Sequence, residues 1–300
     1  MPLISVIIPT YNRAKYLKFA IQSVLDQTVK DHEIIVVDDG STDDTGEMLR
    51  AYPKVQAVFQ ENQGVIVARN KGMHLAKGEF VAFLDSDDLW FRDKLERQLR
   101  FFDQDEKLDM VHGMMDCVDK EGHPLLGLTE SGRGLWEHGN RKGSSYETYI
   151  LDSCSHLDTL MIRRNSLAKI GEFDSKTPVC EDYDFFLRIA AQGRIGFLGG
   201  KPLASFRVHT NGFELGKYDA GHIQVLKKHL ALVESNALPV NRKLALRNLQ
   251  LSLSRKYFYM KDMINGRKHF KEAIRIDPSV LFMWPYARLF LSSWLFPRRR

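Results

Sequence analysis

The chain has 300 residues, of which 44% are hydrophobic and 27% are charged, and this composition excludes long disorder and fibrous repeats. Three cysteines, Cys117, Cys154 and Cys180, are too few and too far apart for a Cys-based zinc site or a disulfide framework, which indicates a reducing cytosol. The net charge of +5 is uneven, because residues 221–300 hold 16 Lys and Arg against 4 Asp and Glu, whereas residues 1–220 hold 27 against 34.

The first hundred residues alternate between strand patterns and helix patterns. Short β-branched apolar runs predict strands at residues 3–8, 33–37, 55–59 and 79–84. The first run has no basic segment before it and ends at Pro9, so we expect no signal peptide. Helical spacing predicts helices at residues 17–25, 42–49 and 65–76, the last with a face of small residues suited to close packing on a sheet. The alternation predicts an α/β fold with a mostly parallel sheet and helices on both faces.

The patterns in the rest of the chain are weaker. Residues 126–145 hold five glycines and little periodicity, which predicts a long lid or binding loop. Strands are predicted at residues 158–162, 194–198 and 203–208, and a helix at 181–191. Helical stripes follow at 223–233, 246–260 and 267–276, before a mostly apolar segment at 279–296. We therefore expect a domain at 1–215, with halves 1–110 and 111–215, and a basic helical appendage at 216–300.

Polar residues follow three of the predicted strands at their carboxyl ends. They are Pro9-Thr10-Tyr11-Asn12, Asp38-Asp39 and Asp85-Ser86-Asp87. Ligands of open α/β sheets bind outside this edge of the sheet, so the three clusters predict a binding site. The two carboxylates of Asp85-x-Asp87 suit Mg²⁺ or Mn²⁺ that bridges to substrate phosphates. The alternative is that Asp87 or Asp88 only caps the following helix.

Four motifs occur in order along this half of the chain. They are I-P-T-Y-N at 8–12, V-V-D-D-G-S-T-D at 36–43, Q-G-x-x-x-A-R-N at 63–70 and F-L-D-S-D-D at 83–88. Together they resemble the nucleotide-sugar half of a family 2 glycosyltransferase, the inverting GT-A type. C-E-D-Y-D-F at 180–185 resembles that family's catalytic E-D motif, and F-R-V-H-T-N at 206–211 resembles its closing strand. The resemblance spans residues 3–211 and implies the Rossmann-like fold of nucleotide-diphospho-sugar transferases.

The resemblance implies that one group of residues binds a nucleoside-diphosphate sugar, with a UDP-sugar favoured. Asp39 would accept the imide N–H of uracil, and Arg69 would lie near the base and the diphosphate. Asp85 would contact the ribose or a metal-bound water. The alternatives are a turn residue for Asp39 and an exposed helix charge for Arg69. The whole group consists of Pro9, Thr10, Tyr11, Asn12, Asp39, Arg69, Asp85 and Ser86.

The resemblance also implies a metal site and a catalytic base. Asp87, with Asp85 and His209, would hold Mn²⁺ or Mg²⁺, which neutralises the diphosphate leaving group. The alternative for His209 is a surface histidine in a turn. Asp182 would take the proton of the acceptor hydroxyl in a single displacement, with Glu181 as a supporting or acceptor-binding group. The alternative is that these acids only complement a helix dipole.

The C-terminal segment at 279–296 is close to the minimum length of a membrane-spanning helix, but Pro285 and Arg288 lie near its centre. Its tryptophans and tyrosine, with the terminal Arg298-Arg299-Arg300, instead suit a membrane interface. We expect a cytoplasmic protein held peripherally on the anionic inner face of the cell membrane. A helix docked on the protein's own core is the open alternative. Nucleic acid is not an expected partner, since the basic residues carry no known binding motif.

The expected activity is metal-dependent hexosyl transfer to a hydroxyl of a saccharide or lipid-linked saccharide, in polysaccharide or glycolipid synthesis. Two other classes stay open. A sugar nucleotidyltransferase would need a Gly-rich phosphate loop with a basic residue after the first strand, where Pro9-Thr10-Tyr11-Asn12 stands. A non-catalytic nucleotide-sugar-binding module would not need the complete set of acids. The sequence lacks the P-loop, the dinucleotide-binding and the nucleophile-elbow motifs.

Overall fold

The computed structural model describes residues 1–125, 145–151, 156–209, 215–283, 286–288 and 290–291. The chain divides into two compact units. The first unit comprises Met1–Ser144, Cys154–Ser175 and Gly193–Gly212, and the second comprises Ser145–Ser153, Lys176–Gln192 and Phe213–Arg300. The predicted helical tail therefore shares its unit with two earlier segments. The loop predicted at 126–145 lies, apart from Ser145, outside the described residues.

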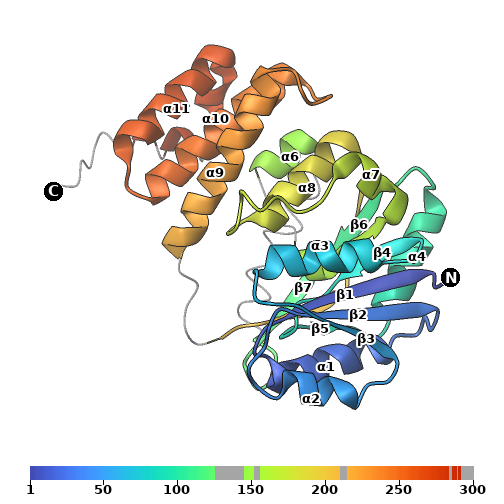
Figure 1. Cartoon of the computed structure of the whole chain (residues 1–300). Helices are drawn as coiled ribbons and strands as arrows, with labels where there is room; N and C mark the ends of the chain where they lie inside the picture. Colours follow the sequence, from blue (N-terminus) through green and yellow to red (C-terminus); the bar gives the residue numbers. More distant parts are fainter. Residues whose placement is uncertain (126–144, 152–155, 210–214, 284–285, 289, 292–300) are drawn as a thin grey trace. The chain divides into compact units, whose positions relative to one another are not determined.

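The described part of the first unit contains a seven-stranded sheet in the order β3-β2-β1-β4-β8-β6-β9 (Figure 1). Neighbours pair in parallel from β3 to β4 and again between β6 and β9, whereas β8 is antiparallel to β4 and β6. The mostly parallel sheet that we predicted is confirmed. The strands are β1 (Ile4–Thr10), β2 (His32–Asp38), β3 (Val55–Phe59), β4 (Phe80–Phe83), β6 (Met110–Gly113), β8 (Met161–Arg163) and β9 (Ile195–Leu198).

A smaller sheet with the order β5-β10-β7 belongs to the same unit. It consists of β5 (Leu89–Trp90), β10 (Ala204–Arg207) and β7 (Met115–Val118), and β10 is antiparallel to β5 and parallel to β7. Because β5 follows the Asp85-x-Asp87 loop, this sheet brings the end of β10 to that loop. The strand predicted at 158–162 is wrong in its first half, where the 3-10 turn η1 (Leu157–Thr159) precedes β8. The hydroxyl of Thr159 closes this turn by donating to the carbonyl of His156, at 2.8 Å.

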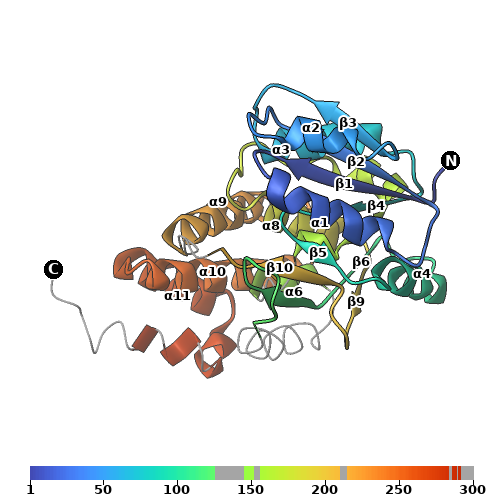
Figure 2. The same ribbon diagram turned by 90° about the horizontal axis from the view of Figure 1, so that it is seen from below.

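Helices cover both faces of the main sheet. Figure 1 shows α1 (Ala14–Leu25) and α2 (Thr45–Arg50) on one face and α3 (Val65–Leu75) on the other, and α1 lies in front of β1 in Figure 2. The side chains of α1, α2 and α4 (Lys94–Gln104) pack with one face of β1, β2 and β4 in an apolar core. On the other face, a Cβ atom at Gly72 would collide with the Ile7 side chain. The predicted close approach of α3 to the sheet is thereby confirmed.

The described residues of the second unit form helices joined by loops. The helices are α6 (Tyr146–Leu151), α8 (Glu181–Gln192), α9 (Leu215–Glu234), α10 (Arg242–Tyr259), α11 (Met263–Ile276) and the 3-10 helix η3 (Pro278–Phe282). Helix α10 packs against α6, α9 and α11. Val280 and Tyr286 are buried in a cluster with Leu251 and Phe270, whereas Phe282 is 90% exposed. Part of the segment at 279–296 is thus docked on its own unit. Within the described residues, no helix has the length and apolar character needed to cross a membrane.

Candidate active site

A pocket of about 280 Å³ opens at the carboxyl ends of β1, β2 and β4, where the sequence predicted a binding site. It is lined by Pro9, Thr10, Tyr11, Arg13, Asp39, Val65, Ala68, Arg69, Asp85, Ser86 and Asp87. Parallel strands end at the same edge of a sheet, which is why loops from distant positions in the chain meet here. Arg13, Val65 and Ala68 were not predicted. Val65 and Ala68 share the helix face of Arg69, so spacing along α3 could have identified them.

The loop after β1 is tied to the loop after β2. Asn12 has a left-handed backbone conformation, with φ 51°, which asparagine tolerates better than most residues. Its side-chain oxygen accepts the N–H of Thr42 at 2.7 Å, and its own N–H donates to the Ser41 hydroxyl at 2.8 Å. Asn12 therefore shapes the wall of the pocket and is not among the residues that line it. The buried hydroxyl oxygen of Thr10 has no hydrogen-bond partner within the described part of the chain.

Asp39 is 3% exposed, and three donors hold its carboxylate. Oδ1 accepts from the Gln60 amide at 2.7 Å and from the Gln63 N–H at 2.9 Å, and Oδ2 accepts from the Gly64 N–H at 2.8 Å. Gly64 is the N-cap of α3 and Gln63 precedes it, so the carboxylate lies at the N-terminus of this helix, where free N–H groups stabilise an anion. A carboxylate has about four acceptor positions, so one stays available to a ligand.

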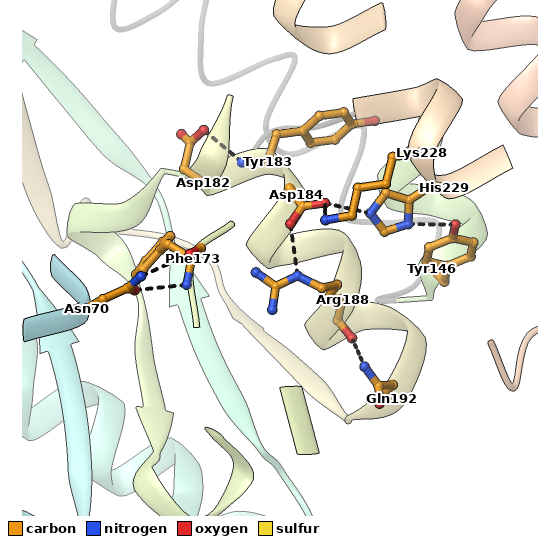
Figure 3. Close-up of polar contacts among 10 residues, drawn as sticks. All are labelled: Asn70, Tyr146, Phe173, Asp182, Tyr183, Asp184, Arg188, Gln192, Lys228 and His229. Carbon is orange, nitrogen blue, oxygen red and sulfur yellow. Dashed lines mark hydrogen bonds and ion pairs between the residues drawn. The ribbon is translucent and has the colours of Figure 1, made fainter. Parts of the chain in front are cut away.

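Arg69 is 5% exposed and is not the exposed helix charge of the alternative interpretation. Its Nη2 lies 2.7 Å from Asp85 Oδ1, and its guanidinium lies 5.7 Å from the Phe173 ring centroid. Burial raises the pKa of Asp85, and the Arg69 guanidinium opposes that rise. Asn70 holds Phe173 in this position. Its side-chain amide exchanges two hydrogen bonds of 3.0 Å with the backbone of Phe173 (Figure 3).

The predicted metal ligands Asp87 and His209 come together. His209 Nε2 lies 2.9 Å from Asp87 Oδ2, and Arg13 Nε lies 3.6 Å from the same oxygen. Arg207, two residues before His209, donates from its Nε to the Asp87 carbonyl at 2.8 Å. It also donates its backbone N–H to Asp88 Oδ1 at 2.7 Å. Arg207 of β10 therefore holds the loop that carries Asp87 and Asp88. Carboxylate oxygens fit Mn²⁺ or Mg²⁺, and the additional imidazole nitrogen is acceptable for Mn²⁺.

A second, buried cluster lies behind this loop. Possible ligand atoms of Asp88, His156 and Asp158 lie within 4.8 Å of one another. Burial and the neighbouring Asp158 raise the pKa of Asp88 well above its usual range. Asp158 Oδ1 accepts the N–H of Asp85 at 2.7 Å, so the cluster also supports the pocket. The sequence does not predict this cluster, because His156 and Asp158 follow no motif and come next to Asp88 only through the pairing of β8 with β4.

Glu181 and Asp182 lie in the first turn of α8, in the second unit. Glu181 is 8% exposed, and Asp182 is half-buried with its Oδ1 accepting the Tyr183 N–H at 2.7 Å (Figure 3). The N-terminal turn of a helix stabilises a carboxylate, as expected. The predicted donor-binding and metal-binding residues thus belong to the first unit, and the two predicted catalytic acids belong to the second.

Residues 5–171 match the family model described as Glycosyl transferase family 2. TuaG of Bacillus subtilis (strain 168), a glycosyltransferase named for teichuronic acid biosynthesis, is 33% identical over 224 residues. That alignment covers 73% of this chain and 84% of TuaG.

Two solved structures have a similar fold. TarS of S. aureus, residues 1–349, has a TM-score of 0.65 at 20% identity, with 93% of this chain and 83% of that chain covered, and it has also been solved with UDP-GlcNAc. The mannosyltransferase PcManGT from Pyrobaculum calidifontis, in complex with GDP-Man and Mn²⁺, has a TM-score of 0.61 at 20% identity, with 99% and 81% covered. These likenesses establish the GT-A fold. The family model and TuaG go further, and by them the chain belongs to glycosyl transferase family 2 and is a glycosyltransferase.

Proposed function

We propose that the protein transfers a sugar from a UDP-sugar to a hydroxyl group of a saccharide acceptor, with inversion at the anomeric carbon and with the help of a divalent cation. The observation that carries the proposal is the pocket in which Asp39, Arg69, Asp85 and Asp87 converge at the ends of three parallel strands. A nucleoside-diphosphate sugar requires an acceptor for the imide of its base, a cationic side chain for its phosphate oxygens and carboxylates that hold a metal.

Asp39 is proposed to select the base. Three protein N–H groups hold its carboxylate in one orientation, and its remaining acceptor position suits the imide N–H of uracil. The buried hydroxyl of Thr10 suits the ribose. Arg69 suits the diphosphate, because it lines the pocket and a guanidinium matches the geometry of phosphate oxygens, while the pair with Asp85 holds it in place. TarS has been solved with UDP-GlcNAc and PcManGT with GDP-Man, which supports a nucleoside-diphosphate sugar as the donor, while the preference for UDP rests on the proposed role of Asp39.

Asp87, Asp85 and His209 are proposed to hold the cation. Asp85 and Asp87 line the pocket, and the 2.9 Å contact between His209 Nε2 and Asp87 Oδ2 supports His209 as the third ligand, although it is not a lining residue itself. When bound, Mn²⁺ or Mg²⁺ supplies positive charge against the negative charge that develops on the departing diphosphate. The buried cluster of Asp88, His156 and Asp158 is the competing location, and Asp88 is 1% exposed there.

Asp182 is proposed as the general base. Inversion needs one in-line displacement, in which the acceptor hydroxyl attacks the anomeric carbon and passes its proton to a carboxylate. Asp182 projects from the first turn of α8, and its half-buried side chain is accessible to an acceptor. Glu181 is proposed to support it or to bind the acceptor.

The acceptor is proposed to be a saccharide or lipid-linked saccharide of a polysaccharide or glycolipid, with the protein on the inner face of the cell membrane. TuaG, named for teichuronic acid biosynthesis, supports a cell-surface polymer. The exposed side chains of Leu281 and Phe282, next to a basic helical region, support contact with an anionic membrane surface.

Release of nucleoside diphosphate from a panel of UDP- and GDP-sugars, with and without Mn²⁺ or Mg²⁺, tests the proposal. We expect turnover with one UDP-sugar, a requirement for cation, and a product of inverted anomeric configuration by NMR. Release of pyrophosphate from a nucleoside triphosphate and a sugar phosphate would indicate a nucleotidyltransferase instead. Tight donor binding without turnover under every condition would indicate a binding module. A product with retained configuration would contradict the single displacement.

A further inference from the structure

Asp184 lies on α8, two residues after the proposed base, and is fully buried in the second unit (Figure 3). Its Oδ2 accepts from Arg188 Nε at 2.9 Å, and its Oδ1 lies 2.7 Å from Lys228 Nζ and 3.2 Å from His229 Nε2. Burial alone would raise the pKa of Asp184, but the hydrogen bond from His229 and the charge of Arg188 lower it below the usual range. Asp184 is therefore a buried anion, held by its own helix and by two residues of α9.

His229 joins this anion to a third helix. It is 0% exposed, and burial lowers its pKa, which favours the neutral ring with one N–H. The ionised Asp184 can only accept, which assigns that N–H to Nε2. Nδ1 then accepts from the hydroxyl of Tyr146 on α6, at 3.0 Å. A chain of hydrogen bonds thus runs from Tyr146 on α6 through His229 on α9 to Asp184 on α8 (Figure 3).

The hydrogen bonds of Asp184 lie on the opposite side of α8 from Asp182, the proposed base. Residues two positions apart on a helix point about 200° from each other, so the burial of Asp184 turns Asp182 outward. Tyr183, between them, has its hydroxyl 3.3 Å from the Ile150 carbonyl and 3.4 Å from the Tyr149 carbonyl of α6. Polar contacts to α6 and to α9 therefore fix the rotation of the first turn of α8. Apolar packing alone would leave that rotation less well defined, because it is not directional.

We propose that Tyr146, His229 and Asp184 form a positioning network that sets the direction of Asp182. Helix α9 is then part of the structure that orients the base, and the helical region after residue 215 is required for transfer. The proposal rests on the proposed function, through the role of Asp182. Tyr146 is 2% exposed and His229 is 0% exposed, so neither touches substrate and both act through α8.

The test uses the full chain with three variants and one control. His229→Leu removes both hydrogen bonds, Tyr146→Phe removes one hydroxyl and keeps the ring, and His229→Gln keeps one donor and one acceptor. His269→Leu is the matched control, because His269 joins α11 to Gln250 of α10 at 2.6 Å without contact to α8. Amide hydrogen exchange of the first turn of α8 is measured without substrate, and kcat and the donor KM are measured with it.

In His229→Leu we expect the amides at the start of α8 to exchange at least about tenfold faster and kcat to fall about 10- to 100-fold, as for a small misplacement of a reacting group. The donor KM should stay within about twofold, whereas a loss through unfolding alone would lower the amount of active enzyme and leave kcat per folded molecule unchanged. His229→Gln should restore most of kcat. Tyr146→Phe should lower kcat in the wild type and have little further effect in His229→Leu, since the two residues act in one chain.

Normal exchange in α8 together with normal kcat in His229→Leu would overturn the proposal, and so would an equal effect in His269→Leu. If His229→Leu does not fold, Tyr146→Phe decides by the same two measurements. Failure of the proposed function is distinguishable: Asp182→Asn would then keep its turnover, while the exchange of α8 in His229→Leu would still report whether the network holds the helix.

Discussion

His209 Nε2 lies 2.9 Å from Asp87 Oδ2, so the second residue after β10 meets the second acid of the Asp85-x-Asp87 pair across 122 positions of sequence. Arg207 on β10 reinforces this approach by donating to the Asp87 carbonyl. The two side chains are separated by the distance of a hydrogen bond, which is close to the spacing of adjacent ligands around a small divalent cation.

Asp87→Asn should lower transfer at least about 100-fold and leave the fold intact, because the amide keeps the size of the side chain but removes its charge. UDP release is measured over a Mn²⁺ titration, and Mn²⁺ binding is measured by calorimetry. Asp103→Asn is the control, since Asp103 is exposed on α4. Full activity of Asp87→Asn in metal-free buffer would contradict the metal site. Cation binding that survives in Asp87→Asn and disappears in Asp158→Asn would instead place the cation in the buried cluster.

Asp39→Asn should raise the KM for the UDP-sugar about 10- to 100-fold, because an amide cannot accept from the uracil imide and from the N–H groups of Gln63 and Gly64 at the same time. Binding of UMP should weaken by a similar factor, and this is measured by calorimetry without the sugar or the acceptor. Gln60→Leu removes one donor to the same carboxylate and should change the KM by no more than about threefold. Equal effects of the two substitutions would mean that Asp39 acts only on the shape of the loop.

Asp182→Asn should lower kcat by roughly two to four orders of magnitude, which is the usual contribution of a positioned general base. The donor KM should change little, because the nucleotide contacts are proposed for the first unit. Glu234→Gln, an exposed acid at the end of α9, is the control in the second unit. A collapse of donor affinity with a normal rate per bound donor would remove Asp182 from the role of base.

The donor side of the site could be predicted because it follows from strand direction. Once β1, β2 and β4 are assigned as parallel strands, Thr10, Asp39 and Asp85 must come to one edge of the sheet. The buried partners could not be predicted in this way. Asp158 reaches the Asp85 loop only because β8 inserts antiparallel beside β4, and no local pattern encodes that long-range pairing.

The prediction for α9 also omitted a buried residue. The stripe predicted on α9 included Leu226, Leu230 and Val233, but Leu230 is only half-buried and His229 is fully buried. His229 is three residues after Leu226 and four before Val233, so it belongs to the buried stripe by spacing. Its hydrophilic character excluded it from an apolar pattern, although a polar residue on such a stripe indicates a buried partner.

Acid should destabilise the fold through His112, which is 0% exposed on β6 and whose pKa burial lowers to about 3. The unfolded chain binds this proton near pH 6.5, and the folded chain does not, so stability falls as the pH drops from about 6.5 toward 3. The slope is up to about 1.4 kcal/mol per pH unit inside that window. In His112→Phe the urea midpoint should depend less on pH between 6.5 and 4.5. An unchanged slope in His112→Phe would contradict the assignment.

The combined change Leu281→Ser and Phe282→Ser should weaken binding to anionic vesicles at least about tenfold. Leu281 is 53% exposed and Phe282 is 90% exposed, and burying two such side chains in a membrane interface contributes about 1.5–3 kcal/mol each. Co-sedimentation with phosphatidylglycerol vesicles is measured at low and high salt, because basic residues near the surface should add a salt-sensitive part. Phe19→Ser changes an aromatic side chain that is 50% exposed in the first unit, and it should leave binding unchanged.

Substitution is a sharper test of this surface than deletion of residues 279–300. Val280 and Tyr286 are buried against Leu251 and Phe270, so the deletion removes part of the core of the second unit together with the exposed side chains. We expect the deletion to lower the melting temperature, and the double substitution to leave it within about 2 °C, since exposed substitutions usually have small effects on stability. Vesicle binding that is equal in the wild type and in the double variant, at both salt concentrations, would show that these side chains do not contact the membrane and that the segment only completes the core of its own unit.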